Sequence, residues 1–540
     1  MSRSKTSSEP GHRFGCALVV VTLALGAGGA TAQDVPSAGS GRVPSVAVLD
    51  SALAVELRTL QGTQLGLEDA VRLALENSAE ALRAEADLRA AEAVVRRERG
   101  SFDPELFASG SKTSTDLPTA SPFAGADVLE TDDVAGSVGV GMKFTTGTEL
   151  TASLGTVRRS TNSAFATLDP QYDARGSIDL VQPILKGFGR SARADLSAAE
   201  YQLLAARANY EGTQLAVRSL VERSYWQLYA AERDVAVEKV LRDAAAALLE
   251  SADRRARAGL VGPNQVANAR VFLADQETAL LNGTERLGAA SDRLASLVGR
   301  RPDSSAEHFS PLGDPPRAFE VAEQDSVVAL ALRLNHTLRL LENRIGALRV
   351  YERAAAWDVL PQLDLVGSLG SSGLAGTGRD VIFGADTLRT DLDTGLGDSW
   401  SQVFQGDFPT WSAGLVFRLP IGMRQDRGER DLRRAEVERA EHDLLDAQRN
   451  LEEVVRARHR DLDGATDRLR FAKDGVDAAF EQARIGRLEF ENGRTTAFEL
   501  VRLAGDLASA QLRYSQALVR AATAAAELRE LTAGAYPPTP

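Results

Sequence analysis

GLVGPNQVANAR, residues 259–270, follows a helical region that contains no proline between positions 189 and 258. Its closely spaced glycines, proline and asparagine end one helix and begin another, because glycine suits a helix C-terminus and proline the first turn of the next helix. A second stretch, ENGRTTAFELVRL (residues 491–503), interrupts another proline-free helical region in the same manner. We therefore predict two long helices, each followed by a reversal and a returning helix.

The whole order of elements occurs twice along the chain, which indicates an internal repeat. Apolar periodicity predicts a helix over residues 65–100, and VVALALRLNHTLRLLENRI (residues 327–345) is similar to it. The two long helices match in length, because Pro183 and Gly259 lie 76 positions apart and Pro420 and Gly493 lie 73 apart. Between the early helix and the long helix, the first copy has 21 more residues than the second, which is the size of one additional hairpin.

Alternating segments separate the early helix from the long helix in each copy. In VAGSVGVGMKF (residues 134–144) and WSAGLVFRLP (residues 411–420), apolar side chains share one face, and small or polar ones share the other. Their length of about 10 residues fits a tilted strand that crosses a bilayer. We expect two strands in the second copy and four in the first, which gives six membrane strands per chain if the additional hairpin crosses the bilayer and four if it folds over the barrel. We also expect an extracellular loop over residues 370–408. So few strands cannot enclose a pore, and lipid does not tolerate open sheet edges, so several chains must share one barrel.

The N-terminal segment has the pattern of a secretory signal peptide, with basic residues, an apolar run and a small-residue cleavage site at Ala30–Ala32. Cys16, the one cysteine, leaves with this segment, so disulfides and thiolate chemistry are excluded. The net charge of -13 gives no support to nucleic-acid binding. We expect no enzyme, catalytic residue, metal or cofactor, because the histidines have no metal-ligand spacing and the KGFG at 186–189 lacks a P-loop context.

These patterns divide the chain into six expected parts. The ranges are 1–32 for the signal peptide, 33–62 for a partly disordered lead-in, 63–300 for the first repeat, 301–320 for a linker, 321–533 for the second repeat and 534–540 for a C-terminal tail.

Residues 65–532 resemble the TolC family of outer-membrane efflux and secretion channels. The resemblance rests on four motifs in a fixed order: LEDAVRLALENSAE, VQPILKGFG, AGLVGPNQVANAR and ENGRTTAFELVRL. It implies a mainly α fold with membrane strands, in which a homotrimer builds one shared outer-membrane β-barrel in lipid and one α-helical periplasmic tunnel. It also implies a passive exit duct of a tripartite efflux or type I secretion system, supplied by an inner-membrane pump of the RND or ABC type through a periplasmic adaptor, or membrane fusion, protein.

The resemblance also implies two functional regions at the reversals. The adaptor would dock at the periplasmic tip, on Ala258, Gly259, Leu260 and Val261 at one reversal and on Asn492, Gly493 and Arg494 at the other. Acidic residues narrow the tip in many relatives, and the matching positions here are Glu499 and Arg502. Three Glu499 carboxylates could form a cation-attracting ring, or Arg502 could pair with Glu499 and brace the helix. Gly259, Gly493 and Pro263 equally suit ordinary caps of a helical hairpin without a partner.

A secreted or periplasmic coiled-coil spacer or adhesin without a pore is the alternative function. It would also show alanine-rich heptads, but it would not need alternating strands at matched places in two copies. Membrane extraction separates the two hypotheses, since a barrel requires detergent and a spacer does not.

Overall fold

The computed structural model describes residues 55–60, 62–120, 124–303, 306, 308–316, 319, 321–383, 386–492 and 494–537. The expected signal peptide (residues 1–32) lies outside this part of the chain, as does most of the expected lead-in, of which residues 55–59 are helical. None of the helices within these ranges combines the length and the apolar composition that crossing a membrane requires.

The helices form two copies of one series. The first copy contains α2 (Leu67–Asn77), α3 (Ala79–Gly100), α4 (Ala194–Arg257) and α5 (Pro263–Val298). The second contains α6 (Gln324–Leu334), α7 (His336–Asp358), α9 (Arg424–Glu491) and α10 (Ala497–Leu531). Corresponding helices have 11 and 11, 22 and 23, 64 and 68, and 36 and 35 residues. The predicted mainly α fold with two internal repeats is confirmed.

The single helix expected over residues 65–100 is wrong in one respect, because the chain leaves the helical conformation at Ser78. The Ser78 hydroxyl accepts a hydrogen bond from the backbone N–H of Ala81 at 3.2 Å, and α3 starts there. Asn335 does the same for α7, where its side-chain oxygen accepts from the N–H groups of Thr337 and Leu338. Such side chains satisfy backbone donors that have no partner in the first turn, so an N-cap can divide a helix whose apolar pattern continues.

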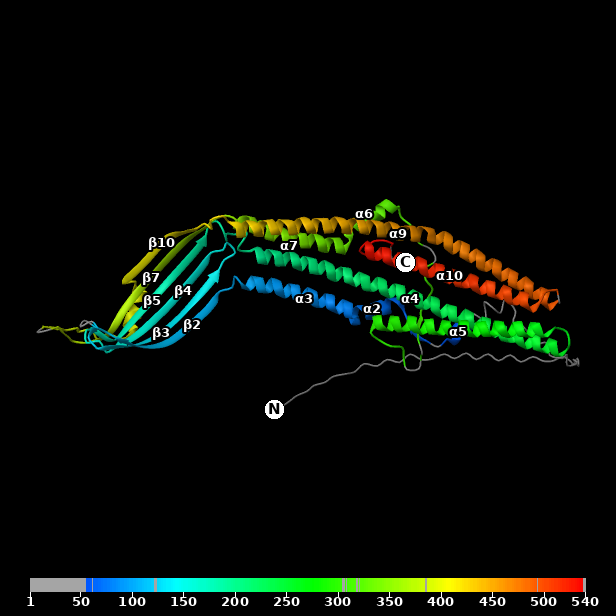
Figure 1. The fold of residues 1–540 in the computed structure, drawn as a ribbon, viewed down its shortest axis with the longest axis horizontal. Coiled ribbons are helices and arrows are strands. Elements are labelled where there is room, and N and C mark those ends of the chain that lie inside the picture. Colours follow the sequence, from blue (N-terminus) through cyan, green and yellow to red (C-terminus); the bar gives the residue numbers. More distant parts are fainter. Residues whose placement is uncertain are drawn as a thin grey trace, which may run out of the picture. The chain divides into compact units, whose positions relative to one another are not determined.

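α4 lies in the middle of a layer of helices (Figure 1). It packs against α3 and α7 in its first part and against α5 and α10 in its second, and α9 packs against both α7 and α10. Short helices in succession therefore accompany each long one. With 64 residues, α4 is roughly 96 Å long at 1.5 Å per residue.

The largest buried cluster lies where α2, α4 and α5 meet a parallel pair of short strands, β1 (Thr63–Leu65) and β6 (Phe309–Pro311). Tyr225 is fully buried there, with its hydroxyl 3.0 Å from the carbonyl oxygen of Leu65 and 2.9 Å from that of Leu312. Burial raises the pKa of Tyr225 to about 12. The hydroxyl therefore joins the beginning of the first copy to the segment between the copies.

Six antiparallel strands form one sheet at the end of the helices, in the order β10-β7-β5-β4-β3-β2 (Figure 1). The first copy supplies β2 (Glu105–Pro118), β3 (Val128–Lys143), β4 (Glu149–Thr161) and β5 (Leu168–Pro183). The second supplies β7 (Gln362–Gly378) and β10 (Phe408–Arg418). The edge strand β2 is exposed along its whole length, and the other edge strand, β10, along most of its length.

The two faces of the sheet differ as the alternation predicts. In the register of the sheet, Leu369 on β7 lies opposite Ile178 on β5 and opposite Trp411 on β10. One row of large apolar side chains therefore crosses three strands. This apolar face is exposed, and Trp411 is 76% exposed. Its exposed members include Leu106, Val134, Val138, Val140, Leu154, Ile178, Leu365, Leu369, Trp411, Leu415 and Phe417.

The expected loop over residues 370–408 is wrong in extent. Strand β7 continues to Gly378, two short strands follow as β8 (Val381–Phe383) and β9 (Asp386–Leu388), and residues Leu396–Gln405 form helix α8. The sequence of this part of β7 is rich in glycine and serine, so it carries no apolar alternation, although its backbone pairs with β5 over the same residues. Backbone pairing therefore extends the strand where the side chains give no signal.

Candidate functional site

The first reversal ends α4 in a tight hydrogen-bonded motif. Gly259 has a φ of +70°, which glycine adopts at little cost. The N–H of Gly259 donates to the carbonyl of Ala256 at 3.0 Å, and that of Leu260 to the carbonyl of Arg255 at 2.9 Å. This pair of bonds is the Schellman motif, which satisfies the last carbonyls of a helix. Pro263 then occupies the first turn of α5, as the sequence predicts.

The second reversal repeats this arrangement. The backbone N–H of Arg494 donates to the carbonyl of Glu489 at 2.8 Å, which corresponds to the bond from Leu260 to Arg255. Asn492 is the C-cap of α9, and its side-chain amide donates to the carbonyl of Leu488 at 2.6 Å. Gly493, the expected counterpart of Gly259, lies outside the described residues. Thr496 is the N-cap of the returning helix α10, and its hydroxyl accepts from the N–H of Glu499 at 3.3 Å.

Both reversals lie at the end of the helices remote from the sheet (Figure 1). The guanidinium of Arg255, near the end of α4, lies 4.5 Å from the centre of the Phe490 ring, near the end of α9. This cation–π contact joins the two copies one turn before each reversal. The seven residues expected to dock an adaptor therefore lie on two neighbouring turns, apart from Gly493, which is not described.

Large apolar side chains are exposed at both turns. Leu260 is 74% exposed beside Ala258 and Gly259, and Phe498 is 67% exposed in the first turn of α10. These two side chains leave apolar surface at the turns that the packing of the helices does not cover. Sequence reasoning named Leu260 but missed Phe498, although TAFE at residues 496–499 has the Thr-x-x-Glu spacing of a helix N-terminus and places Phe498 in the first turn.

The structure brings the two aperture candidates into direct contact. Arg502 forms two hydrogen bonds with the Glu499 carboxylate, at 2.5 and 3.1 Å, and a third with Asp506 at 3.1 Å. These bonds to Arg502 hold the pKa of Glu499 below its usual value. All three groups lie on the exposed surface of α10, so a single chain presents two carboxylates and one guanidinium here. Asp506 was missed in the sequence because the resemblance drew attention to only two positions.

The polar face of the sheet carries a hydrogen-bonded network. Arg159 on β4 binds Asp133 on β3 at 2.9 Å, and the Asp179 carboxylate on β5 accepts from Ser177 and from Ser368 on β7, at 2.8 and 2.7 Å. A hollow of about 830 Å³ lies over this face. Its lining residues include Ser109, Ser137, Thr156, Arg159, Asp173 and Arg175.

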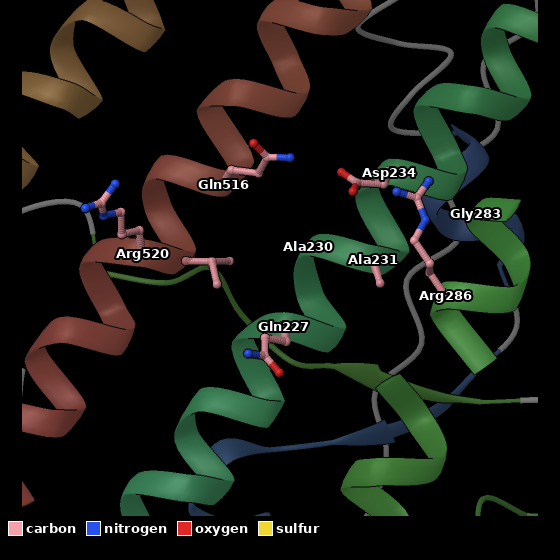
Figure 2. Close-up of a pocket in the computed structure, with 9 residues that line it drawn as sticks. Gln227, Ala230, Ala231, Asp234, Gly283, Arg286, Gln516 and Arg520 are labelled. Atoms are coloured by element: carbon pink, nitrogen blue, oxygen red, sulfur yellow. The ribbon is translucent and has the colours of Figure 1, made fainter. Parts of the chain in front are cut away.

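A smaller cavity of about 290 Å³ lies between α4, α5 and α10 (Figure 2). Figure 2 shows the carboxylate of Asp234 on α4 directed away from Arg286 of α5 and toward the side of the cavity on which Gln516 of α10 lies. Burial raises the pKa of Asp234 to about 6, and the positive charge of Arg286 opposes this shift. Arg286 binds the carboxylate of Glu238 at 2.8 Å, so it is shared between two acids.

The described residues include no group of three or more His, Cys, Asp or Glu side chains that could hold a metal ion. The candidate functional features of the described residues are surfaces: two helical turns, the exposed segment of α10 that carries Glu499, Arg502 and Asp506, and a sheet with one apolar and one polar face.

Comparisons with known proteins agree with this architecture. Residues 70–300 and 327–534 each match the family model described as outer membrane efflux protein, so the two matches coincide with the two copies. The cobalt-zinc-cadmium resistance protein CzcC of Cupriavidus metallidurans is 29% identical over 215 residues, which are 38% of this chain. The match spans about half, 51%, of that relative's length.

Two solved structures are similar in fold. The outer-membrane channel OprN has a TM-score of 0.63 at 18% identity, over 87% of this chain and 90% of that chain. The outer membrane protein VceC of Vibrio cholerae has a TM-score of 0.61 at 16% identity, over 87% of this chain and 97% of that chain. The resemblance to TolC-type channels, inferred from four motifs, is thus confirmed. With both copies matched by the family model, the chain belongs to the outer membrane efflux protein family, whose members lie in the outer membrane with their helices in the periplasm.

Proposed function

We propose that this protein is the passive exit duct of a tripartite export system, either an efflux pump or a type I secretion system. Three copies would close one barrel in the outer membrane and one helical tunnel in the periplasm. An inner-membrane pump of the RND or ABC type would supply the substrate through a periplasmic adaptor. The chain would contribute walls and docking surfaces, with no catalytic step of its own.

The observation that carries this proposal is the sheet, which has two exposed edge strands, an apolar face and a polar face. Strand β2 follows α3 and runs away from the helices, whereas β10 runs back toward α9. The β10 strand of one copy can therefore pair antiparallel with the β2 strand of the next, and a closed ring has no open edge in lipid. Three copies of six strands would give an eighteen-stranded barrel with the apolar face toward lipid and the polar face toward water.

The decisive experiment is single-channel conductance of the purified, detergent-extracted protein in a planar bilayer. A duct predicts discrete openings, and a protein that requires detergent for release from membranes. A spacer without a pore predicts release without detergent and no openings from well-folded oligomers, and either result would contradict the proposal. An eighteen-stranded barrel also predicts three chains per channel, which native mass spectrometry counts directly.

Adaptor docking is proposed at the two turns, on Ala258, Gly259, Leu260, Val261, Asn492, Gly493 and Arg494. The shared hydrogen-bonding pattern of the turns and the exposure of Leu260 support it. Leu260→Asp should lower export in cells while the conductance of purified channels stays unchanged. Val271→Asp is the matched control, since Val271 is a similarly exposed apolar residue further along α5. Equal loss in both variants, or normal export in Leu260→Asp, would exclude this docking surface.

A further inference from the structure

Helix α8 (Leu396–Gln405) lies on the apolar face of the sheet, packed against β5 and β7. Two glycines on this face make room for it. A Cβ atom at Gly373 would lie 1.9 Å from the carbonyl oxygen of Ser399, and one at Gly176 would lie 3.1 Å from a methyl carbon of Val403. Alternate residues of a strand share a face, so Gly176 and Gly373 belong to the face of Ile178 and Leu369.

The helix is fixed in place and is not a loose part of a loop. Ser399 and Val403 are buried against the sheet. The Gln402 amide bonds to both backbone groups of Leu374, accepting from the N–H at 2.9 Å and donating to the carbonyl at 3.1 Å. At its start, the backbone N–H of Gly395 donates to the Asp398 carboxylate at 2.7 Å. These contacts use the sheet-facing side of α8 and leave another side available.

That other side is aromatic. The rings of Trp400 and Phe404 stack with their centres 5.9 Å apart, and Phe404 is 73% exposed. Leu396, one turn before Trp400, is also exposed, whereas Asp398, Ser401 and Gln405 form the polar side. A short helix with separate aromatic and polar sides is typical of helices that lie in a membrane interface.

The position of α8 favours lipid over a second copy of the chain as the covering partner. The helix contacts β5, an interior strand, and β7 just beyond Ser372, the last residue that β10 pairs, whereas neighbouring copies would join at the edge strands β2 and β10. It contacts β7 at Gly373 and Leu374, in the part of the strand remote from the long helices. Strand β7 has 17 residues, and about 10 suffice to cross the apolar core, so this part lies near the bilayer surface.

We propose that α8 is an interfacial helix that inserts Trp400 and Phe404 among the outer-membrane lipids at the level of the headgroups and sets the depth of the sheet. Aromatic residues at that level are favoured because an amphipathic or flat ring tolerates both the apolar core and the hydrated surface. The inference rests on the apolar face of the sheet meeting lipid.

Site-directed spin labelling tests it on the full-length protein in lipid bilayers. Cys16, the one cysteine, is expected to leave with the signal peptide, so the mature protein gives a cysteine-free background for Phe404→Cys, for Ser401→Cys on the polar side of α8, and for Leu369→Cys on the sheet. Phe404 is 73% exposed and its ring stacks on Trp400 of the same helix, so its replacement should leave the fold intact. The measurement is collision of each label with oxygen, which concentrates in lipid, and with a water-soluble nickel chelate.

The expected result is a ratio of oxygen to nickel accessibility that is severalfold higher at positions 404 and 369 than at position 401. A high nickel accessibility at position 404 would overturn the inference by placing α8 in water. Low accessibility to both reagents would overturn it by showing that a neighbouring copy covers the ring. If position 369 also meets the nickel chelate, the sheet is outside the bilayer and the proposed duct fails together with this inference.

A second measurement uses native tryptophan. The fluorescence of Trp400 is obtained by subtracting the signal of Trp400→Phe from that of the wild type. Lipids brominated near the headgroup should quench this fluorescence more than lipids brominated near the chain ends. The reverse order, or no quenching, would contradict an interfacial depth.

Discussion

Replacing Asp234 with asparagine should make the protein more stable at neutral pH but not at pH 4. Burial in the cavity between α4, α5 and α10 raises the pKa of Asp234 from 3.8 to about 6, so the folded state disfavours the carboxylate. Below pH 4 the group is protonated in both the folded and unfolded states and costs nothing. As pH rises from 4 to 6, the unfolded chain loses its proton first, and the folded state loses stability; above pH 6 the loss is constant.

The size of the effect follows from the shift. At 1.36 kcal/mol per pKa unit the cost is about 3 kcal/mol, and screening at this partly exposed site reduces it to about 1.5 kcal/mol. The neighbouring charges are Glu238 on the same helix and Arg286 on α5; Arg520 of α10 is bound to Asp461 at 2.8 Å. Asparagine keeps the shape of the side chain and removes the ionisation, so it should recover that free energy at pH 8.

Two assays measure the effect of Asp234→Asn on stability and the titration of the Asp234 carboxyl. Denaturant unfolding of the detergent-solubilised protein at pH 4 and pH 8 gives the difference in the free energy of unfolding between Asp234→Asn and the wild type. Infrared difference spectra of the same pair should contain a protonated carboxyl band that disappears with a midpoint near pH 6. Asp243→Asn, an exposed carboxylate on the same helix that binds Arg242 at 2.7 Å, is the control for removal of any acid from α4. A stability difference that is equal at both pH values, or a band that disappears near pH 4, would refute the reasoning.

Three further predictions address the core, the helix break and the aperture. Tyr225→Phe should lower the free energy of unfolding by about 1 kcal/mol, because the Leu312 carbonyl loses its hydroxyl partner; denaturant unfolding measures this, with the exposed Tyr201→Phe as control. Asn335→Ala should cost about 2 kcal/mol, because it removes both the cap of α7 and the hydrogen bond from the Asn335 amide to the Leu531 carbonyl, whereas Asn343→Ala, whose amide donates to Arg339 of the same helix, should be nearly neutral in the same assay. Arg502→Gln should increase the preference of the channel for cations in planar bilayers, because it releases the Glu499 and Asp506 carboxylates and lets the pKa of Glu499 rise toward its usual value. Arg484→Gln, which breaks an equally short exposed pair with Glu481 on α9, is its control, and equal selectivity in both variants would exclude a role of this segment in the aperture.

Periodicity was enough to predict the long helices and their reversals, because glycine and proline have only a few suitable positions in a helical hairpin. The apolar and polar faces of the strands could also be predicted wherever valine and leucine alternate with glycine and serine, as in β3 and β10. Prediction failed at β7 and α8, where glycine replaces apolar residues because a helix packs directly on the strand. Side chains alone do not reveal such a contact, since the space left by Gly373 becomes meaningful only when Ser399 is seen beside it.

The functional residues were predicted less completely than the fold. Glu499 and Arg502 were named from the resemblance, and their spacing of three residues gave the ion pair as one of two alternatives, which the structure contains. The third member, Asp506, was not predicted. The helix break at Ser78 had a readable signal, since serine and asparagine at matched places in both copies are strong N-caps. No sequence pattern predicts the raised pKa of Asp234, because that pKa depends on how closely α5 and α10 pack against α4.

The additional hairpin of the first copy has a geometric reason within the proposed duct. Next to the sheet, each chain presents four helices side by side, in the order α3, α4, α7 and α9. At an interaxial distance of about 9 Å they span about 36 Å of the tunnel's circumference. Six strands at about 4.8 Å spacing, tilted by about 40°, span about 38 Å, whereas four strands would span about 25 Å. Six strands therefore match the width of the helical wall, and the barrel continues the tunnel without a constriction at their junction.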